Sequence, residues 1–398
     1  KNMQYSFADR MATTPRSFIR EILKVTENPD IISFAGGLPN PALFPIKELA
    51  ETAEKVIREN GASALQYATT EGYPPLREWI AERYRIRHNL NVSPDEILIT
   101  NGSQQCLDLI GKIFINKGSP VGIERPGYLG AIQAFSMFEP VFTTVPLDMN
   151  GPDPGAFARM ATREKPVFFY GVPNSQNPSG VTWSRERRRE IADSARAEGL
   201  LLVEDDAYGE IRFSGDVLPL MRTLLPDQTV MCGSFSKVIA PGMRMGWLCG
   251  PAEIISQAVT AKQGTDLHSN YLTQRIICEY LQTYPLDNYI REITSTYRSQ
   301  CSCMRDAIRD SFPESVTCTN PDGGMFLWVT LPDGYSSMEV FHRAIAQNVA
   351  VLPGIPFYTD GGGDTTMRLN FSNANHEMIR EGIERLGKIL HAYLNEPR

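Results

Sequence analysis

The sequence has 398 residues, more than one small hydrophobic core accommodates, so we expect a large domain and a smaller one. Its content of 42% hydrophobic and 21% charged residues is that of an ordinary soluble globular protein. The net charge of −7, without a dense basic run, argues against nucleic acid or an anionic membrane as partner. No apolar stretch reaches the roughly 18–20 residues that span a bilayer.

The cysteines, the histidines and the amino terminus point to an intracellular protein without a metal. The seven cysteines are an odd number without a CxxC pair, and the five histidines form no HExxH motif. The first 20 residues lack the apolar run of a secretory signal peptide. We therefore expect a cytoplasmic protein with reduced thiols and no metal site.

The predicted elements follow two patterns along the chain. Residues 1–45 are rich in proline and glycine, so we expect them to join the smaller domain and cover the site. From 46 to 285, short apolar runs alternate with longer amphipathic ones, which predicts a large domain with a mainly parallel sheet flanked by helices. The predicted helices include 104–115 and 184–198, the latter between a Ser184 cap and Gly199. The predicted strands are 97–100, 120–124, 140–146, 167–172, 200–204, 229–233 and 245–249.

The alternation changes near residue 285. A long helical pattern at 286–311 leads into predicted strands at 325–330 and 366–371 and a last helix at about 375–394. This pattern predicts a second, smaller α+β domain over 286–398.

The strongest chemical signal is the segment GSFSKVIAPGMRMGW at 233–247. Lys237 follows Ser234 and Ser236 at the end of a predicted strand, and Arg244 follows a Pro-Gly turn. Hydroxyls and a fixed cation suit a phosphate. A partly desolvated lysine on rigid backbone can be neutral near pH 7, as Schiff-base chemistry requires. The segment therefore predicts a phosphate site beside a reactive lysine, although a lone lysine after a strand is by default a surface residue.

A second signal is EDDAYGE at 204–210, at the carboxyl end of a predicted strand. Asp205, rather than Asp206, is the carboxylate that we expect to keep the nitrogen of a heteroaromatic cofactor protonated. Tyr208, one turn further on, is placed to donate a hydrogen bond to an oxygen of the same ring. Taken alone, an acidic strand end equally suits a metal or a helix cap.

Three weaker motifs also follow predicted strands. In NGSQQ, a helix start would direct Ser103 and Gln104 toward an anion. In ERPGY, Tyr128 is placed to stack on a ring, and in NPSG, Asn177 offers an amide. Each of these segments also suits an ordinary turn. Together, however, all five motifs lie at the edge of a parallel sheet where ligands bind.

The motifs, in their order along the chain, resemble those of the fold-type I pyridoxal-phosphate enzymes, specifically the class I/II aminotransferases. The match covers nearly the whole chain and includes SFAGGLPNPALFP, LQYATTEGYPPLRE, PDGGMFLW and MRLNFS. FIREIL followed by SFAGGLPNP is similar to the 2-aminoadipate, kynurenine and aromatic aminotransferase branch. The resemblance implies the α/β aminotransferase fold type I, with a mainly parallel seven-stranded sheet plus the smaller α+β domain.

The resemblance also implies roles for single residues around pyridoxal 5'-phosphate. Lys237 would hold the cofactor as a Schiff base and move the Cα proton, and Asp205 would pair with the pyridinium. Tyr208 and Asn177 would hold the phenolate oxygen, and Tyr128 would stack on the ring. Tyr67 would reach the phosphate in the partner subunit's site, which implies a homodimer with shared active sites. The phosphate would otherwise be bound by Ser103, Gln104, Ser234, Ser236 and Arg244.

For the substrate, the resemblance implies that Arg368 clamps the α-carboxylate, helped by Gly37 and Asn177. Arg20 resembles a position that contacts substrate side chains. The expected reaction is ping-pong transamination between an acidic amino acid such as 2-aminoadipate, or an aromatic one, and a 2-oxo acid such as 2-oxoglutarate. Phe357 and Tyr358 suit an apolar wall of the site, or equally the core.

Two other functions remain open at this stage. A decarboxylase, β-lyase or synthase would position the same cofactor in the same fold. A regulatory protein with an aminotransferase-like domain is the second, although only about 30 residues precede the first family motif, too few for a normal DNA-binding domain.

Overall fold

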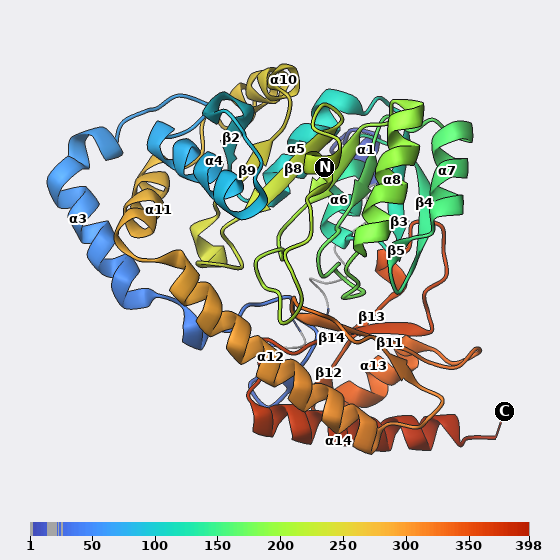
Figure 1. Cartoon of the computed structure of the whole chain (residues 1–398). Coiled ribbons are helices and arrows are strands. Elements are labelled where there is room, and N and C mark those ends of the chain that lie inside the picture. Colours follow the sequence, from blue (N-terminus) through green and yellow to red (C-terminus); the bar gives the residue numbers. More distant parts are fainter. Residues whose placement is uncertain (1–2, 14–21, 23, 25–26, 398) are drawn as a thin grey trace.

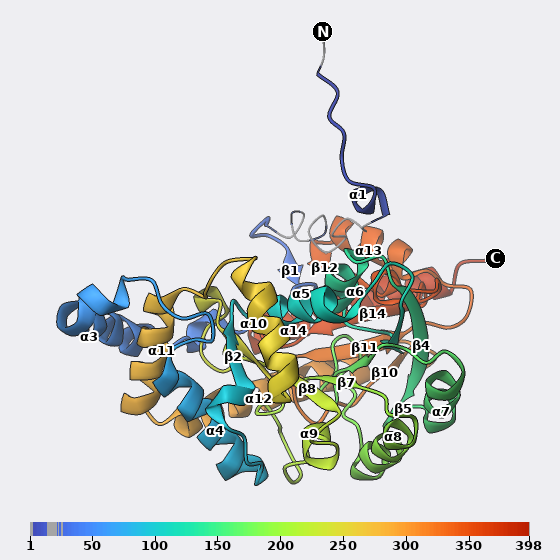
Figure 2. The same ribbon diagram turned by 90° about the horizontal axis from the view of Figure 1, so that it is seen from above.

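The computed structural model describes residues 3–13, 22, 24 and 27–397. A large sheet with helices on both faces forms one part of the molecule, and a smaller sheet lies beside it, with two long helices along it (Figure 1). The described residues around α1 (Arg10–Thr13) extend away from this body, as Figure 2 shows. This α/β architecture with a second α+β part agrees with the expectation from the sequence.

In the described part of the chain the large sheet has eight strands, in the order β2-β9-β8-β7-β6-β3-β4-β5. Seven of them are the predicted strands, and the eighth, β5 (Gly151–Pro152), pairs antiparallel with the end of β4. Two residues are too few to produce an apolar run, which is why the sequence predicted seven strands. The other strands are β2 (Ile97–Thr100), β3 (Pro120–Arg125), β4 (Val141–Asp148), β6 (Phe169–Gly171), β7 (Leu202–Asp205), β8 (Thr229–Ser234) and β9 (Gly246–Cys249).

The sheet is mainly parallel, and its central strands are buried on both faces. Only β9, between β2 and β8, and the short β5 run antiparallel to their neighbours. In β8, Val230 and Cys232 enter the core on one face of the sheet, and Met231 enters the core on the other. Because both faces are covered, apolar residues occupy successive positions, so the strands read as continuous apolar runs.

Different helices cover the two faces of this sheet (Figure 2). Helix α8 has the predicted caps, since the Arg187 backbone N–H donates to Ser184 Oγ at 3.1 Å and Gly199 has φ +64°. One face carries α5 (Ser103–Phe114), α6 (Leu129–Ser136) and α10 (Ala252–Gln263), and the other carries α4 (Pro74–His88), α7 (Pro154–Arg163), α8 (Arg185–Glu198) and α9 (Met221–Leu224).

Helix α3 (Ile46–Ala64) projects from one side of the molecule, at the left of Figure 1, where it packs against α11 (Tyr271–Thr283). Its Val56 enters a small apolar cluster with Ile276. Ile46 and Ile57 on the same helix are exposed. The apolar surface of α3 is therefore only partly covered within one subunit.

The smaller sheet is antiparallel and has the order β10-β11-β14-β13. The long helix predicted at 286–311 has those bounds, and it lies along the last helix (Figure 1). The strands are β10 (Thr317–Cys318), β11 (Phe326–Thr330), β13 (Leu352–Pro353) and β14 (Thr366–Asn370), and the helices are α12 (Leu286–Ser311), α13 (Ser337–Ala346) and α14 (His376–Leu394).

The segment before α3 is attached to this smaller part. Strand β1 (Ile32–Ser33) pairs in parallel with β12 (Val349–Ala350). Phe34 is fully buried, and its backbone N–H donates to Ala350 O at 2.8 Å. This pairing carries Gly37 to the junction of the two sheets, where the candidate site lies.

Candidate active site

A cavity of about 390 Å³ opens at the carboxyl ends of β7 and β8, between the two parts of the chain. Every predicted site residue except Tyr67 and Arg20 lines it. The residues concerned are Gly37, Ser103, Gln104, Tyr128, Asn177, Asp205, Tyr208, Ser234, Ser236, Lys237, Arg244 and Arg368.

Lys237 follows β8 and turns its amine into this cavity. Its Nζ donates to the carbonyl oxygen of Gly37 at 3.3 Å and lies 5.9 Å from the centre of the Tyr208 ring. Burial, together with the positive charges of Arg368 and Arg244, lowers the pKa of Lys237 to about 8. Its amine is therefore neutral far more often near pH 7 than that of a surface lysine.

Asp205 ends β7 and is buried beside the same cavity. Its Oδ2 accepts a hydrogen bond from the Tyr170 hydroxyl at 2.6 Å, whereas its buried Oδ1 has no partner. Burial raises the pKa of Asp205 to about 6, and the hydrogen bond from Tyr170 and the positive charge of Lys237 oppose that rise. An unpartnered buried acceptor calls for a donor from a ligand.

An anion site lies where α5 begins. Gly102, with φ +75°, precedes the first turn, and a Cβ built on it would lie 2.6 Å from Arg244 Nη2. Glycine therefore lets the guanidinium approach the amino terminus of the helix closely. Ser234 and Ser236 are buried beside it, and the Ser236 N–H donates to Ser234 Oγ at 3.0 Å. A helix dipole, hydroxyls and a cation thus converge on one spot.

Arg368, from β14, is a buried cation. Its Nη1 donates to Asn177 Oδ1 at 2.8 Å and its Nη2 to Ala35 O at 2.9 Å, while its Nε has no partner. No carboxylate of the described residues forms an ion pair with it. Burial lowers its pKa to about 10, so it stays charged near neutral pH. A buried cation without an acidic partner suits an anionic ligand.

Two tyrosines, Tyr128 and Tyr208, line the cavity. Burial raises the pKa of Tyr128 to about 12 and raises that of the more deeply buried Tyr208 as well. Both hydroxyls therefore keep their protons near neutral pH. Phe357, which the sequence left open between wall and core, is buried and also lines the cavity.

Two predicted site residues are not in this cavity. Tyr67 is 79% exposed, and its ring meets His268 edge to face with the ring centres 6.0 Å apart. Arg20 lies outside the described residues. Tyr358, which the sequence left open between wall and core, does not line the cavity. Its ring lies under the Arg125 guanidinium, whose Cζ is 4.7 Å from the ring centre.

The sequence reasoning missed two polar residues of the site. Tyr170 lies inside the predicted strand 167–172, where an aromatic residue suggests only core packing, yet its hydroxyl reaches Asp205. Gln133, on α6, lines the cavity five residues after Tyr128, and a lone glutamine on a helix gives no signal. The only sign of this hydrogen bond in the sequence was a tyrosine in one predicted strand and an aspartate at the end of the next predicted strand.

The model of the family "Aminotransferase class I and II" matches residues 30–386. The chain belongs to this family. The 2-aminoadipate transaminase of Thermus thermophilus is 44% identical over 95% of this chain and 94% of that protein. The aromatic-amino-acid aminotransferase 1 of Thermococcus litoralis is 39% identical, over 96% and 94% of the two chains.

Solved structures of aminotransferases are also similar to this chain. The crystal structure of the alpha-aminoadipate aminotransferase of Thermus thermophilus, complexed with N-(5'-phosphopyridoxyl)-L-leucine, superposes with a TM-score of 0.92, 42% identity and 98% of both chains covered. The aminotransferase described here uses pyridoxal 5'-phosphate, as the sequence predicted. The cavity suits this group, since it offers the unpartnered Asp205 Oδ1 for a ring nitrogen and the α5 anion site for a phosphate.

Two further findings concern the described residues. They contain no group of three or more histidine, cysteine or acidic side chains that could hold a metal ion. None of their helices is long and apolar enough to cross a membrane.

Proposed function

We propose that this aminotransferase moves an amino group from an acidic amino acid such as 2-aminoadipate, or from an aromatic one, to 2-oxoglutarate. The observation that carries the proposal is the meeting of Lys237, Asp205 and Arg368 around one cavity. The substrate classes are those for which the two similar relatives are named.

Each residue has a proposed task. When bound, pyridoxal phosphate withdraws electrons from the substrate Cα, which makes the Cα proton acidic. Lys237 holds the cofactor covalently, and its freed amine takes the Cα proton and returns it at the cofactor carbon. Asp205 keeps the ring nitrogen protonated, while Tyr208 and Asn177 hold the ring oxygen and Tyr128 stacks on the ring. The phosphate is bound by Ser103, Gln104, Ser234, Ser236 and Arg244, and by Tyr67 in the partner subunit's site.

The substrate carboxylate is proposed to bind Arg368. The fork of this arginine is already oriented by Asn177 Oδ1 and Ala35 O, so little side-chain freedom is lost when a carboxylate binds. Gly37 lies beside the guanidinium, since a Cβ there would be 3.7 Å from Nη2. Arg20 is proposed to contact the distal end of the substrate.

Replacing Arg368 is expected to weaken substrate binding selectively. Truncating one partner of a buried, hydrogen-bonded charge pair costs about 2–5 kcal/mol, so Arg368→Met should raise KM about 30-fold or more. Arg368→Lys keeps the positive charge but loses the two-pronged guanidinium, so its KM should lie between that of the wild type and that of Arg368→Met. Steady-state kinetics measure the effect, and cofactor affinity is the control. An unchanged KM in Arg368→Met would reject the clamp.

The lowered pKa of Lys237 predicts the pH dependence of cofactor capture by the apoenzyme. Only the neutral amine attacks, and with a pKa of about 8 about one amine in ten is neutral at pH 7. The capture rate, followed by stopped-flow absorbance, should rise about tenfold per pH unit below pH 8 and level off above it. An inflection near the ordinary lysine value of 10.5 would contradict this.

The reaction and the substrate are tested together with a panel of amino acids. Enzyme incubated with one amino acid and no acceptor should yield at most one equivalent of keto acid per site, with no released CO₂ or ammonia. Continuous release of CO₂ would favour a decarboxylase, and continuous release of ammonia would favour a β-lyase. Adding 2-oxoglutarate should restore turnover, and the ranking of acidic against aromatic donors identifies the substrate class.

A homodimer with shared active sites is part of the proposal. Tyr67 is 79% exposed, and Leu65 and Ile46 nearby in the chain are also exposed, at 69% and 70%. Apolar surface of this kind suits a subunit interface. Light scattering should give twice the mass of the chain.

We also propose a cytoplasmic location, supported by the seven free cysteines. We further propose that the chain divides into an N-terminal segment, 1–45, a large domain, 46–285, and a small domain, 286–398.

A further inference from the structure

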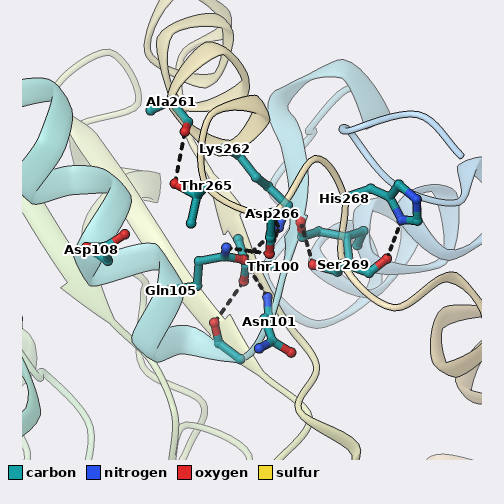
Figure 3. Close-up of polar contacts among 12 residues, drawn as sticks. Thr100, Asn101, Gln105, Asp108, Ala261, Lys262, Thr265, Asp266, His268 and Ser269 are labelled. Atoms are coloured by element: carbon teal, nitrogen blue, oxygen red, sulfur yellow. Dashed lines mark hydrogen bonds and ion pairs between the residues drawn. The ribbon is translucent and has the colours of Figure 1, made fainter. Parts of the chain in front are cut away.

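Lys262, near the end of α10, is a buried lysine to which the proposed reaction assigns no task. Its side chain is fully buried. Its Nζ donates to Gln105 Oε1 at 2.6 Å and to the two carboxylate oxygens of Asp266 at 2.9 and 3.0 Å (Figure 3). Burial lowers the pKa of Lys262, and the contact with Asp266 opposes this. Lysine is almost never fully buried unless it is paired, and the partners of Lys262 are Asp266 and Gln105.

Gln105 links this buried pair to the start of α5. Its Oε1 accepts from Lys262 and also from the backbone N–H of Asn101 at 2.8 Å (Figure 3). Its Nε2 donates to Asp266 Oδ2 at 2.7 Å. The orientation of the Gln105 amide is therefore set by three partners, and through it the backbone at Asn101 is held.

The segment held in this way is the anion site described above. Asn101 and Gly102 connect β2 to α5, and Ser103 and Gln104 line the cavity. Gly102 lies against the Arg244 guanidinium. A displacement of Asn101 by a fraction of an ångström would thus move the N–H groups at the helix start relative to Arg244. Side chains that orient binding groups in this way affect affinity without touching the ligand.

We propose that Lys262 is a positioning residue for the cofactor phosphate. Through Gln105 it holds the turn at Asn101–Gly102 so that the amino terminus of α5 and Arg244 meet the same phosphate oxygens. The inference rests on the proposed phosphate role of Ser103 and Gln104.

The test compares Lys262→Met with the wild type in titrations of apoenzyme with pyridoxal 5'-phosphate and with pyridoxal, which lacks the phosphate. Replacing a side chain that orients a binding group typically lowers affinity about 10- to 100-fold. We expect this loss for pyridoxal phosphate only, with the Kd for pyridoxal changed less than about twofold. Equal losses for both ligands, or no loss for either, would overturn the proposal.

Two further variants separate positioning from folding. Gln105→Ala leaves the Lys262–Asp266 pair in place and should show the same selective loss even where Lys262→Met folds poorly. Lys112→Met is the matched control, because Lys112 Nζ contacts Thr265 Oγ1, next to Asp266 in the chain, at 2.7 Å without touching Gln105. Its Kd values should be those of the wild type. A Ser103→Ala variant without any loss would refute the proposed phosphate site itself, whatever Lys262→Met does.

Discussion

Lys237→Ala is expected to abolish covalent binding of the cofactor and to lower the transamination rate by about 10²–10⁴-fold or more, the range that a positioned general base contributes. The reason is that Lys237 supplies the amine with a depressed pKa that faces the cavity, with Nζ 3.3 Å from Gly37 O. Reduction with borohydride followed by mass spectrometry should find the cofactor on the peptide that contains Lys237. The same peptide of the variant should be unmodified.

Lys112→Ala is the control for this experiment, since Lys112 is a partly exposed lysine that pairs with Asp108 outside the cavity. It should keep both the labelled Lys237 peptide and the rate. If Lys237→Ala retained a covalent cofactor and its turnover, another amine would hold the cofactor, and the assignment of the whole 233–247 segment would fail.

Asp205→Asn is expected to have the second largest effect. Removing one partner of a buried charge pair costs about 3–5 kcal/mol, which corresponds to about 150- to 5,000-fold in the rate of the first half-reaction. The amide cannot hold the ring nitrogen in its protonated form, so the cofactor withdraws electrons less well. Stopped-flow absorbance with a saturating amino acid measures the step, and ¹⁵N NMR of labelled cofactor reports the protonation of the ring nitrogen.

Tyr170→Phe is expected to affect the same step as Asp205→Asn, but less strongly. It keeps the carboxylate but removes the 2.6 Å hydrogen bond to Oδ2, which makes the charged form of Asp205 less stable. The proton of the ring nitrogen should then shift toward Asp205, with a loss of about tenfold in rate. A full rate in Asp205→Asn with a protonated ring nitrogen would show that another group pairs with the ring.

Much of the fold followed from local patterns in the sequence. The seven main strands, helix α8 with its caps and the whole of α12 were predicted because burial on one or two faces leaves a pattern in neighbouring residues, from 3 in β6 to 26 in α12. The two-residue strands β1, β5, β10, β12 and β13 were missed because their pairing partners, not their own side chains, define them.

The candidate site, like the fold, was predictable from the sequence only in part. By itself, the sequence determined which groups stand at the carboxyl ends of the strands, including Lys237 and Asp205, since those positions depend on short-range pattern and on the parallel sheet. Only the tertiary structure decided what these groups meet. Arg368 donates to Asn177, 191 residues away, and Tyr170 on β6 donates to Asp205 on the neighbouring strand β7. Such contacts, like the burial of Lys262 against Gln105, arise from packing between distant segments, and no local periodicity records them.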